Sequence, residues 1–306
     1  MRALVTGATG FAGSHLMEAL RQSEDVEAHG TSLSQPERDN IHHTDLTDYD
    51  SVVALLDELR PDTIYHLAAF ASVALSLKTP VEAVTSTLAM QINLYQACLA
   101  LGLKPRMLVV SSGQIYGMAS ASQLPLAETT PLDFSNPYSV AKAGQENLVS
   151  MYGKMGLESV IARPFNHFGP GQRPGYLIAD LTKQIAELER DGGETLRVGN
   201  LSSKRDFTDV RDIVRAYMLL AEKGKAGEAY NVCTGRSRSG QEILDLLLEI
   251  SPQKIRTEQD PERMRPADIP DLRGDATKIQ LDTGWTPRIP LEQTLSDTLG
   301  YWRGQV

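Results

Sequence analysis

The sequence predicts an α/β fold: a Rossmann-type, doubly wound parallel sheet with a smaller mixed α/β substrate-binding domain. Short apolar runs alternate with segments of helical periodicity through the first 165 residues, which is typical of right-handed βαβ units. The apolar runs are nearly continuous, as expected of strands that helices cover on both faces. A glycine-rich turn joins the first run to the first helical segment, and this turn is the third indication.

The alternation assigns the elements in order. Strands are predicted at 2–7, 26–32, 63–69, 106–112 and 158–165. Helices are predicted at 11–22, 49–59, 80–102 and 136–156, where apolar residues recur at helical spacing. The later part has a Gly/Pro-rich loop at 168–175, helices at 176–190 and 239–250, and one more strand of the first sheet at 228–235. We therefore expect a dinucleotide-binding domain of 1–165 plus about 206–234, and a substrate domain of about 166–205 plus 235–306.

Composition and charge exclude several classes of function. The chain is 41% hydrophobic and 23% charged, which is ordinary for a globular protein. Its net charge of −9 argues against nucleic acid or an anionic membrane as the main partner. Cys98 and Cys233 are predicted to be small, buried apolar side chains. No Cys/His spacing is typical of a zinc site, so no metal site is expected. The chain opens on a predicted strand and has no membrane-length apolar run, so we expect a cytoplasmic protein.

The segment TGATGFAG places three glycines, Gly7, Gly10 and Gly13, between the first strand and its helix. Glycine permits φ values closed to other residues, lets the backbone approach a pyrophosphate and lets the helix pack close to the sheet. The free N–H groups of the helix N-terminus, around Phe11 and Ala12, would then face the phosphates. The spacing G-x-x-G-x-x-G in this strand–turn–helix context predicts dinucleotide binding.

The end of the second strand indicates which dinucleotide is bound. An NAD site usually has an acidic residue there that holds the ribose 2′-hydroxyl. Here the stretch HGTSLSQPER offers hydroxyls, including Ser32, with Arg38 further on, and it has no acid at the strand end to repel a 2′-phosphate. We therefore expect NADPH, with NADH also accepted. Asp45, in the segment HTDLTD between the predicted strands at 26–32 and 63–69, is expected near the adenine. The alternative is a turn or a helix cap.

The segment PYSVAK places Tyr138 and Lys142 at i and i+4, on one helix face. A phenol with a pKa of about 10 exchanges protons poorly near neutrality unless a nearby ammonium stabilises the phenolate. The same lysine can hold the nicotinamide ribose, and Ser112, at a strand end, can hydrogen-bond the reacting oxygen. We expect hydride transfer at a carbinol carbon with Tyr138 handling the proton; an exposed Tyr/Lys pair without function is the alternative.

Together, TGATGFAG, HLAA, SS…YG, YSVAK and ARPFNHFGPGQ resemble the extended short-chain dehydrogenase/reductase family that acts on nucleotide sugars. The resemblance runs through the closing GWTPRIPLEQTL and so covers essentially the whole chain. It implies that Ser112, Tyr138 and Lys142 are the catalytic group, the latter two also touching the cofactor. Beyond the glycine loop and Ser32, the cofactor contacts that it implies are Asp45, Leu46, Leu67, Ala68, Ala69 and Pro164.

Dehydratases of this family carry an acid two residues before the tyrosine of the YG pair, where a Glu takes the C5 proton and helps to expel the C6 hydroxyl. This sequence has Gln114 at that position. An amide has no usable pKa and cannot take the proton. We therefore expect a site that moves a hydride and a proton at one carbon but does not eliminate water.

The second half of the chain resembles the GDP-mannose branch of the family in RPFNHFGPGQRPGYLIADLTKQI, VGNLSSKRDFTDVRDIVRAY and PERMRPADIPDLRGD. This implies a GDP-sugar substrate and reduction of the C4 ketone of GDP-4-keto-6-deoxy-D-mannose to GDP-D-rhamnose, downstream of a GDP-mannose 4,6-dehydratase. Guanidinium groups suit phosphate oxygens, so Arg205 and Arg265 could converge on the pyrophosphate, unless they form surface salt bridges. The expected substrate contacts are Ser72, Gln114, Asn166, Lys183, Val198, Asn200, Arg205 and Arg265.

Three other functions remain open: an NDP-sugar 4-epimerase with tightly bound NAD, a GDP-mannose 4,6-dehydratase, which Gln114 disfavours, and a non-catalytic dinucleotide sensor. One departure from the family lies in the helix at 80–102, where Thr87 and Met90 replace the usual Asn and Gly. This helix and the one carrying Tyr138 commonly form a dimer interface in the family, so a homodimer is expected. The apolar residues of the first helix would serve a dimer or an intrachain core equally: Val84, Leu88, Ile92 and Leu94.

Overall fold

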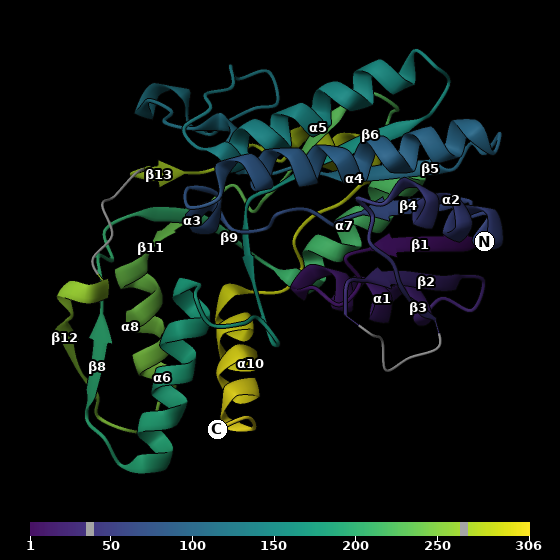
Figure 1. The fold of residues 1–306 in the computed structure, drawn as a ribbon. Helices are drawn as coiled ribbons and strands as arrows, with labels where there is room; N and C mark the ends of the chain where they lie inside the picture. The colour runs from purple at the N-terminus through teal and green to yellow at the C-terminus, as the bar shows by residue number, and fades with distance from the viewer. Residues whose placement is uncertain (35–39, 264–268) are drawn as a thin grey trace.

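The computed structural model describes residues 1–34, 40–263 and 269–306 (Figure 1). A large parallel sheet with helices on both faces forms one unit, and a group of helices with short strands forms a smaller unit beside it. This arrangement confirms the predicted fold class. Within these ranges, no helix has the length and apolar character needed to cross a bilayer.

The large sheet has seven strands among the described residues, in the order β10-β6-β5-β4-β1-β2-β3. Every neighbouring pair is parallel. The strands are β1 (Arg2–Thr6), β2 (Glu27–Ser32), β3 (Ile41–His43), β4 (Thr63–His66), β5 (Arg106–Val110), β6 (Ser159–Pro164) and β10 (Ala229–Val232). Because the order reverses at β1, the strand ends beside it form the crevice in which doubly wound sheets bind ligands.

Two apolar cores cover the two faces of this sheet. Along β1, Ala3 and Val5 join one core and Leu4 joins the other, as the alternation of a strand requires. The first core contains α1 (Phe11–Arg21), α7 (Val210–Lys223) and α9 (Thr277–Thr283). The second contains α2 (Tyr49–Leu59), α4 (Pro80–Ala100) and α5 (Pro137–Gly153). The helices predicted for the first half of the chain therefore form, and both cysteines are buried and free as expected.

The smaller unit has its own core on α6 (Leu177–Asp191), α8 (Gly240–Ile250) and α10 (Leu291–Arg303), which pack together (Figure 1). Ser239 and Glu242 form the predicted capping box at the start of α8. The short strands of this unit are β7 (Asn166–Phe168), β8 (Thr195–Val198), β9 (Lys204–Asp209), β11 (Ser237–Ser239), β12 (Arg256–Gln259) and β13 (Asp271–Leu272). Strand β9 pairs with β7, β11 and β13, and β8 pairs with β12.

Two details of the packing bear on the predicted division of the chain, which stays a prediction. In the described part of the chain, strand β9 pairs only with strands of the smaller unit, whereas the prediction placed about 206–234 in the dinucleotide-binding domain. Helix α9 packs on the large sheet, although the prediction placed 235–306 in the substrate domain. The reason is apolar burial: Ile279 and Trp285 are fully buried against the first core, and the Trp285 indole donates to the Asp212 carbonyl at 3.0 Å.

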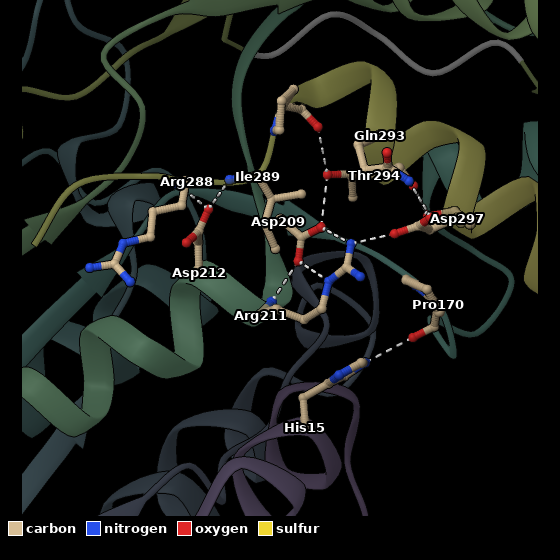
Figure 2. Close-up of polar contacts among 12 residues, drawn as sticks. His15, Pro170, Asp209, Arg211, Asp212, Arg288, Ile289, Gln293, Thr294 and Asp297 are labelled. Atoms are coloured by element: carbon tan, nitrogen blue, oxygen red, sulfur yellow. Dashed lines mark hydrogen bonds and ion pairs between the residues drawn. The ribbon is translucent and has the colours of Figure 1, made fainter.

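Carboxylates at the start of α7 tie the C-terminal segment to the large unit (Figure 2). Arg211 donates to Asp209 at 2.6 Å and to Asp297 of α10 at 2.7 Å. The Asp212 carboxylate accepts from the main-chain nitrogens of Arg288 and Ile289 at 2.7 and 2.8 Å. These contacts fix α10, and with it the core of the smaller unit, against the strand ends where the candidate site lies.

Candidate active site

The glycine loop after β1 has the geometry of a phosphate cradle. Gly7 has a φ of +69°, and a Cβ there would lie 3.1 Å from the nitrogen of Ala68. A Cβ on Gly13 would lie 2.1 Å from the Gly7 carbonyl oxygen, so the close approach of α1 to the loop requires glycine. Helix α1 begins after Gly10 without a side-chain cap, so no side chain competes with a ligand for its first N–H groups, at Phe11 and Ala12. This loop fits a dinucleotide pyrophosphate.

Further predicted cofactor residues follow β4 and β6 at the same edge of the sheet. Ala68, between Leu67 and Ala69, donates its N–H to the Thr6 hydroxyl at 3.1 Å, which fixes this segment beside the glycine loop. Pro164 ends β6. Since β6, β5, β4 and β1 are successive neighbours, the residues that follow them lie along one crevice.

Thr87, the departure from the family pattern, has a structural partner. Its hydroxyl accepts the N–H of Phe70 at 3.2 Å, which holds the segment that follows β4. Met90 packs against the core around α4. The hydroxyl at position 87 therefore supports the cofactor crevice.

A cluster of hydroxyls occupies the end of β2. The Ser32 hydroxyl, which is buried, lies 3.0 Å from those of Thr9 and Ser34. Hydroxyl donors suit a ribose 2′-phosphate, whereas a carboxylate would repel it. Arg38 lies outside the described residues.

Asp45 is exposed, and its carboxylate accepts from the nitrogen and the hydroxyl of Thr47 at 2.8 and 2.7 Å. Asp45 therefore stabilises a turn with Thr47, which is the alternative that the sequence analysis gave for this residue. Leu46, beside it, is buried in the second core.

The three predicted catalytic residues come together from β5 and α5. Ser112 follows β5 and is almost buried, and Tyr138 and Lys142 lie in the first turns of α5, which Asn136 caps. The Ser112 side chain interacts with the Tyr138 hydroxyl. The Lys142 ammonium lies 5.9 Å from the centre of the Tyr138 ring.

Burial dominates the electrostatics of this group. Burial raises the pKa of Tyr138 above its ordinary value, Ser112 lowers it in part, and Tyr176 raises it. Burial also lowers the pKa of Lys142 to about 7. The ammonium donates to the Val110 carbonyl oxygen at 2.7 Å, and its stabilisation of a phenolate at Tyr138 stays a prediction. A phenol held protonated is suited to donating its proton to a ketone.

Gln114 and Ser72 lie on short helices around this group. Gln114 is in the 3₁₀ helix η1 (Gly113–Tyr116), and its main-chain nitrogen donates to the Ser112 hydroxyl at 3.2 Å. Ser72 caps α3 (Val73–Ser76) by accepting the N–H of Leu75 at 3.2 Å. The main chain at position 114 therefore contacts Ser112, and the side chain that this position carries is an amide.

The remaining predicted substrate residues separate into two groups. A cavity of about 380 Å³ is lined by Asn166, Val198, Asn200 and Arg205, which come from β7, β8, β9 and the loop between the last two. The Arg205 guanidinium also donates to the Ile269 carbonyl oxygen at 2.7 Å.

Lys183 does not line this cavity. It pairs with Glu187 one turn further along α6, because an i,i+4 Lys/Glu pair shares a helix face. Arg265 lies outside the described residues. In the described part of the chain, no group of three or more His, Cys, Asp or Glu side chains is placed to hold a metal ion.

The sequence prediction missed Tyr176, the residue before α6. It lines the cavity, and it raises the pKa of Tyr138, so it lies near both Tyr138 and the cavity. The available signal was an aromatic residue after the Gly/Pro-rich loop, because functional residues concentrate on loops that a rigid scaffold holds.

Comparison with known proteins agrees with this geometry. The family model for GDP-mannose 4,6 dehydratase matches residues 4–298. GDP-6-deoxy-D-mannose reductase of Pseudomonas aeruginosa is 36% identical over an alignment that covers 100% of this chain and 98% of that protein. GDP-6-deoxy-D-talose 4-dehydrogenase of Aggregatibacter actinomycetemcomitans is 31% identical, with 91% and 90% covered. The structure of RMD from Pseudomonas aeruginosa complexed with NADPH is similar at a TM-score of 0.91, with 35% identity and 100% and 99% covered.

These matches confirm the resemblance that the motifs predict, because they extend over nearly all of the chain rather than over the glycine loop alone. The protein belongs to the GDP-mannose 4,6-dehydratase family of extended short-chain dehydrogenases/reductases, a family of NAD(P)-dependent oxidoreductases.

Proposed function

We propose that this protein reduces the C4 ketone of GDP-4-keto-6-deoxy-D-mannose with NADPH, giving GDP-D-rhamnose. The observation that carries the proposal is the grouping of Ser112, Tyr138 and Lys142 at the cofactor crevice with an amide, Gln114, in place of the dehydratase acid. The full-length similarity to a GDP-6-deoxy-D-mannose reductase supports the same substrate.

NADPH, when bound, supplies the hydride that C4 accepts. Tyr138 donates its proton to the C4 oxygen as that oxygen gains negative charge, and Ser112 hydrogen-bonds the same oxygen. Lys142 holds the ribose hydroxyls with its ammonium. The Gln114 amide can hydrogen-bond the sugar but cannot remove a C5 proton, so the reaction ends as a reduction.

The cavity beside the crevice is proposed to take the GDP group. Asn166 and Asn200 offer amide donors and acceptors, and Arg205 offers a guanidinium for the diphosphate. The hydroxyls around Ser32, which bond to no carboxylate among the described residues, favour NADPH over NADH.

In the test, a GDP-mannose 4,6-dehydratase converts GDP-mannose to the ketosugar, and the protein is then added with NADPH or NADH. We propose that this dehydratase reaction lies upstream of the protein. We expect one reduced cofactor to be consumed per ketosugar, with a higher kcat/KM for NADPH, and NMR of the product to show GDP-D-rhamnose. Its C4 epimer, GDP-6-deoxy-D-talose, would show that the opposite face of the sugar meets the nicotinamide. An enzyme that ignores the ketosugar would refute the proposal.

The same experiment separates the reductase from a 4-epimerase. An epimerase would retain NAD through purification and turn over without added reductant. The absorbance of the purified protein and the requirement for NADPH therefore distinguish the two functions, and turnover of either kind excludes a non-catalytic sensor.

We also propose a homodimer through α4 and α5, which lie side by side on the outside of the large unit (Figure 1). Val81, Val140 and Met151 on these helices are exposed, whereas Leu94 is buried in the core and Leu88 packs over Gly144 of the same chain. Exposed apolar side chains on a helix pair favour association. Sedimentation velocity is expected to give a dimer mass at assay concentrations, and a monomer there would contradict the proposal.

A further inference from the structure

The Lys142 ammonium has a side-chain partner that the motif does not include. Lys142 is 4% exposed, and besides the Val110 carbonyl its Nζ donates to Oε1 of Gln145 at 3.0 Å. Gln145 lies three residues further along α5 and is fully buried. An ammonium has three donors, so these two acceptors leave one donor for the cofactor crevice where Tyr138 lies.

Gln145 is itself held from the neighbouring helix. Gln91 of α4 is fully buried, and its Nε2 donates to the main-chain oxygen of Gln145 at 3.0 Å. The same Nε2 lies 3.5 Å from the Tyr95 hydroxyl. The two glutamines therefore fix α4 against α5 at the level of the lysine.

The orientation of the Gln145 amide is set by chemistry. An ammonium only donates, so the amide must turn its oxygen toward Lys142. Its Nε2 is then buried without a hydrogen-bond partner among the described residues, as is Oε1 of Gln91. Burying an unpartnered amide is unfavourable, so an apolar side chain would suit packing better at this position. The contact with Lys142 is the gain that offsets this cost.

The Glu146 carboxylate raises the pKa of Lys142 through space, but the hydrogen bonds of the ammonium go to Val110 and Gln145. Glu146, the next residue of α5, is engaged by Arg163 of β6 through two hydrogen bonds of 2.9 and 2.6 Å. On β4, burial lowers the pKa of His66 to about 3, and its Nδ1 lies 2.9 Å from the Thr6 hydroxyl, so the ring is neutral.

The hydroxyls around the lysine are also neutral. Burial raises the pKa of Tyr138 on the same helix, and it raises the pKa of Tyr95 on α4 to about 12. Dipolar acceptors, Val110 and Gln145, are therefore the groups that contact the ammonium directly.

We propose that Gln145, braced by Gln91, is a positioning residue that keeps the Lys142 side chain charged and directed toward the Tyr138 hydroxyl and the cofactor. The proposal rests on the proposed reductase function, in which charged Lys142 holds the ribose and supports the tyrosine. It adds two residues from outside the Ser/Tyr/Lys motif to the machinery of the reaction.

The test compares Gln145→Met, which keeps the length of the side chain but removes the acceptor, with Gln145→Glu, which replaces it by a carboxylate. Loss of the acceptor destabilises the ammonium and lowers the Lys142 pKa, so the alkaline limb of the kcat profile should move down by about one pH unit in the Met variant. A carboxylate stabilises the ammonium, so the limb should move up in the Glu variant. The thermal midpoint of the Met variant should stay unchanged or rise, because an unpartnered amide is removed.

A second readout does not depend on the substrate. The ¹³Cε signal of Lys142, assigned by its loss in Lys142→Met, should titrate at a lower pH in Gln145→Met than in the wild type, in protein without substrate. Gln91→Met should give a smaller shift in the same direction. If Gln145→Glu does not fold, Gln91→Met is the second variant that tests the proposal. If the ketosugar were not the substrate, the NMR titration would still decide the proposal.

The matched control is Gln96→Met. Gln96 also joins α4 to α5, by donating to the Tyr152 hydroxyl at 2.8 Å, but it has no contact with Lys142. We expect neither the pH profile nor the lysine titration to move in this variant. A shift equal to that of Gln145→Met, or an unchanged titration in Gln145→Met, would overturn the proposal and assign the glutamines to helix packing alone.

Discussion

Tyr138→Phe is expected to lower kcat by about 10³-fold while the Kd for NADPH stays within about twofold of the wild type. The substitution removes only the hydroxyl that donates the proton to the C4 oxygen, and the ring keeps its place at the start of α5. Ser112 remains able to hydrogen-bond the substrate oxygen, so binding persists while proton transfer fails. Steady-state kinetics with the ketosugar, together with fluorescence titration of NADPH, measure the two effects separately.

Tyr152→Phe is the matched control for this variant. Tyr152 lies on the same helix, is buried in the second core, and accepts a hydrogen bond from Gln96 at 2.8 Å. Its loss should reduce the free energy of unfolding by about 1 kcal/mol and leave kcat unchanged. If Tyr138→Phe kept more than a tenth of the wild-type kcat, the assignment of the phenol as proton donor would be wrong.

The parts of this site that the sequence predicts are those set by local backbone geometry. The glycine loop, the i,i+4 spacing of Tyr138 and Lys142, and the Ser239 capping box each lie within a few residues, so a short segment determines them. Asp45 shows the limit even at short range. Its turn with Thr47 is evident in the structure, whereas the sequence alone favoured an adenine contact and gave the turn as the alternative.

The parts that the sequence does not predict depend on contacts between distant segments. Gln91 and Gln145 are 54 residues apart, and no local pattern indicates that one braces the other. The cavity gathers side chains from β7, α6, β8 and β9, so spacing along the chain could not show that Arg205 lines it and Lys183 does not. The effect of burial on the pKa values of Tyr138 and Lys142 also follows from the assembled fold, so the spacing of the two residues alone could not indicate it.

The second large effect is expected at Gly13, because the stability of the fold and the cofactor site both depend on the close contact of α1 with the Gly7 carbonyl. In Gly13→Ala the new methyl group would lie 2.1 Å from the Gly7 oxygen and 3.0 Å from the Ala8 Cα, so α1 must move away from the loop. Because overpacking of this kind costs about 1–3 kcal/mol, we expect the free energy of unfolding to fall by that amount. The displaced helix N-terminus no longer meets the pyrophosphate, so the Kd for NADPH should rise at least about 100-fold.

Gly300→Ala separates this effect from a general response to removing a helical glycine. Gly300 lies within α10, and a Cβ there would meet no atom within 4 Å. Alanine favours the helix over glycine by about 0.5–1 kcal/mol, so this variant should be slightly more stable and should bind NADPH as the wild type does. Chemical denaturation and NADPH titration of both variants test the argument. Wild-type affinity and stability in Gly13→Ala would mean that the contact between α1 and the Gly7 carbonyl does not set the geometry of the phosphate cradle.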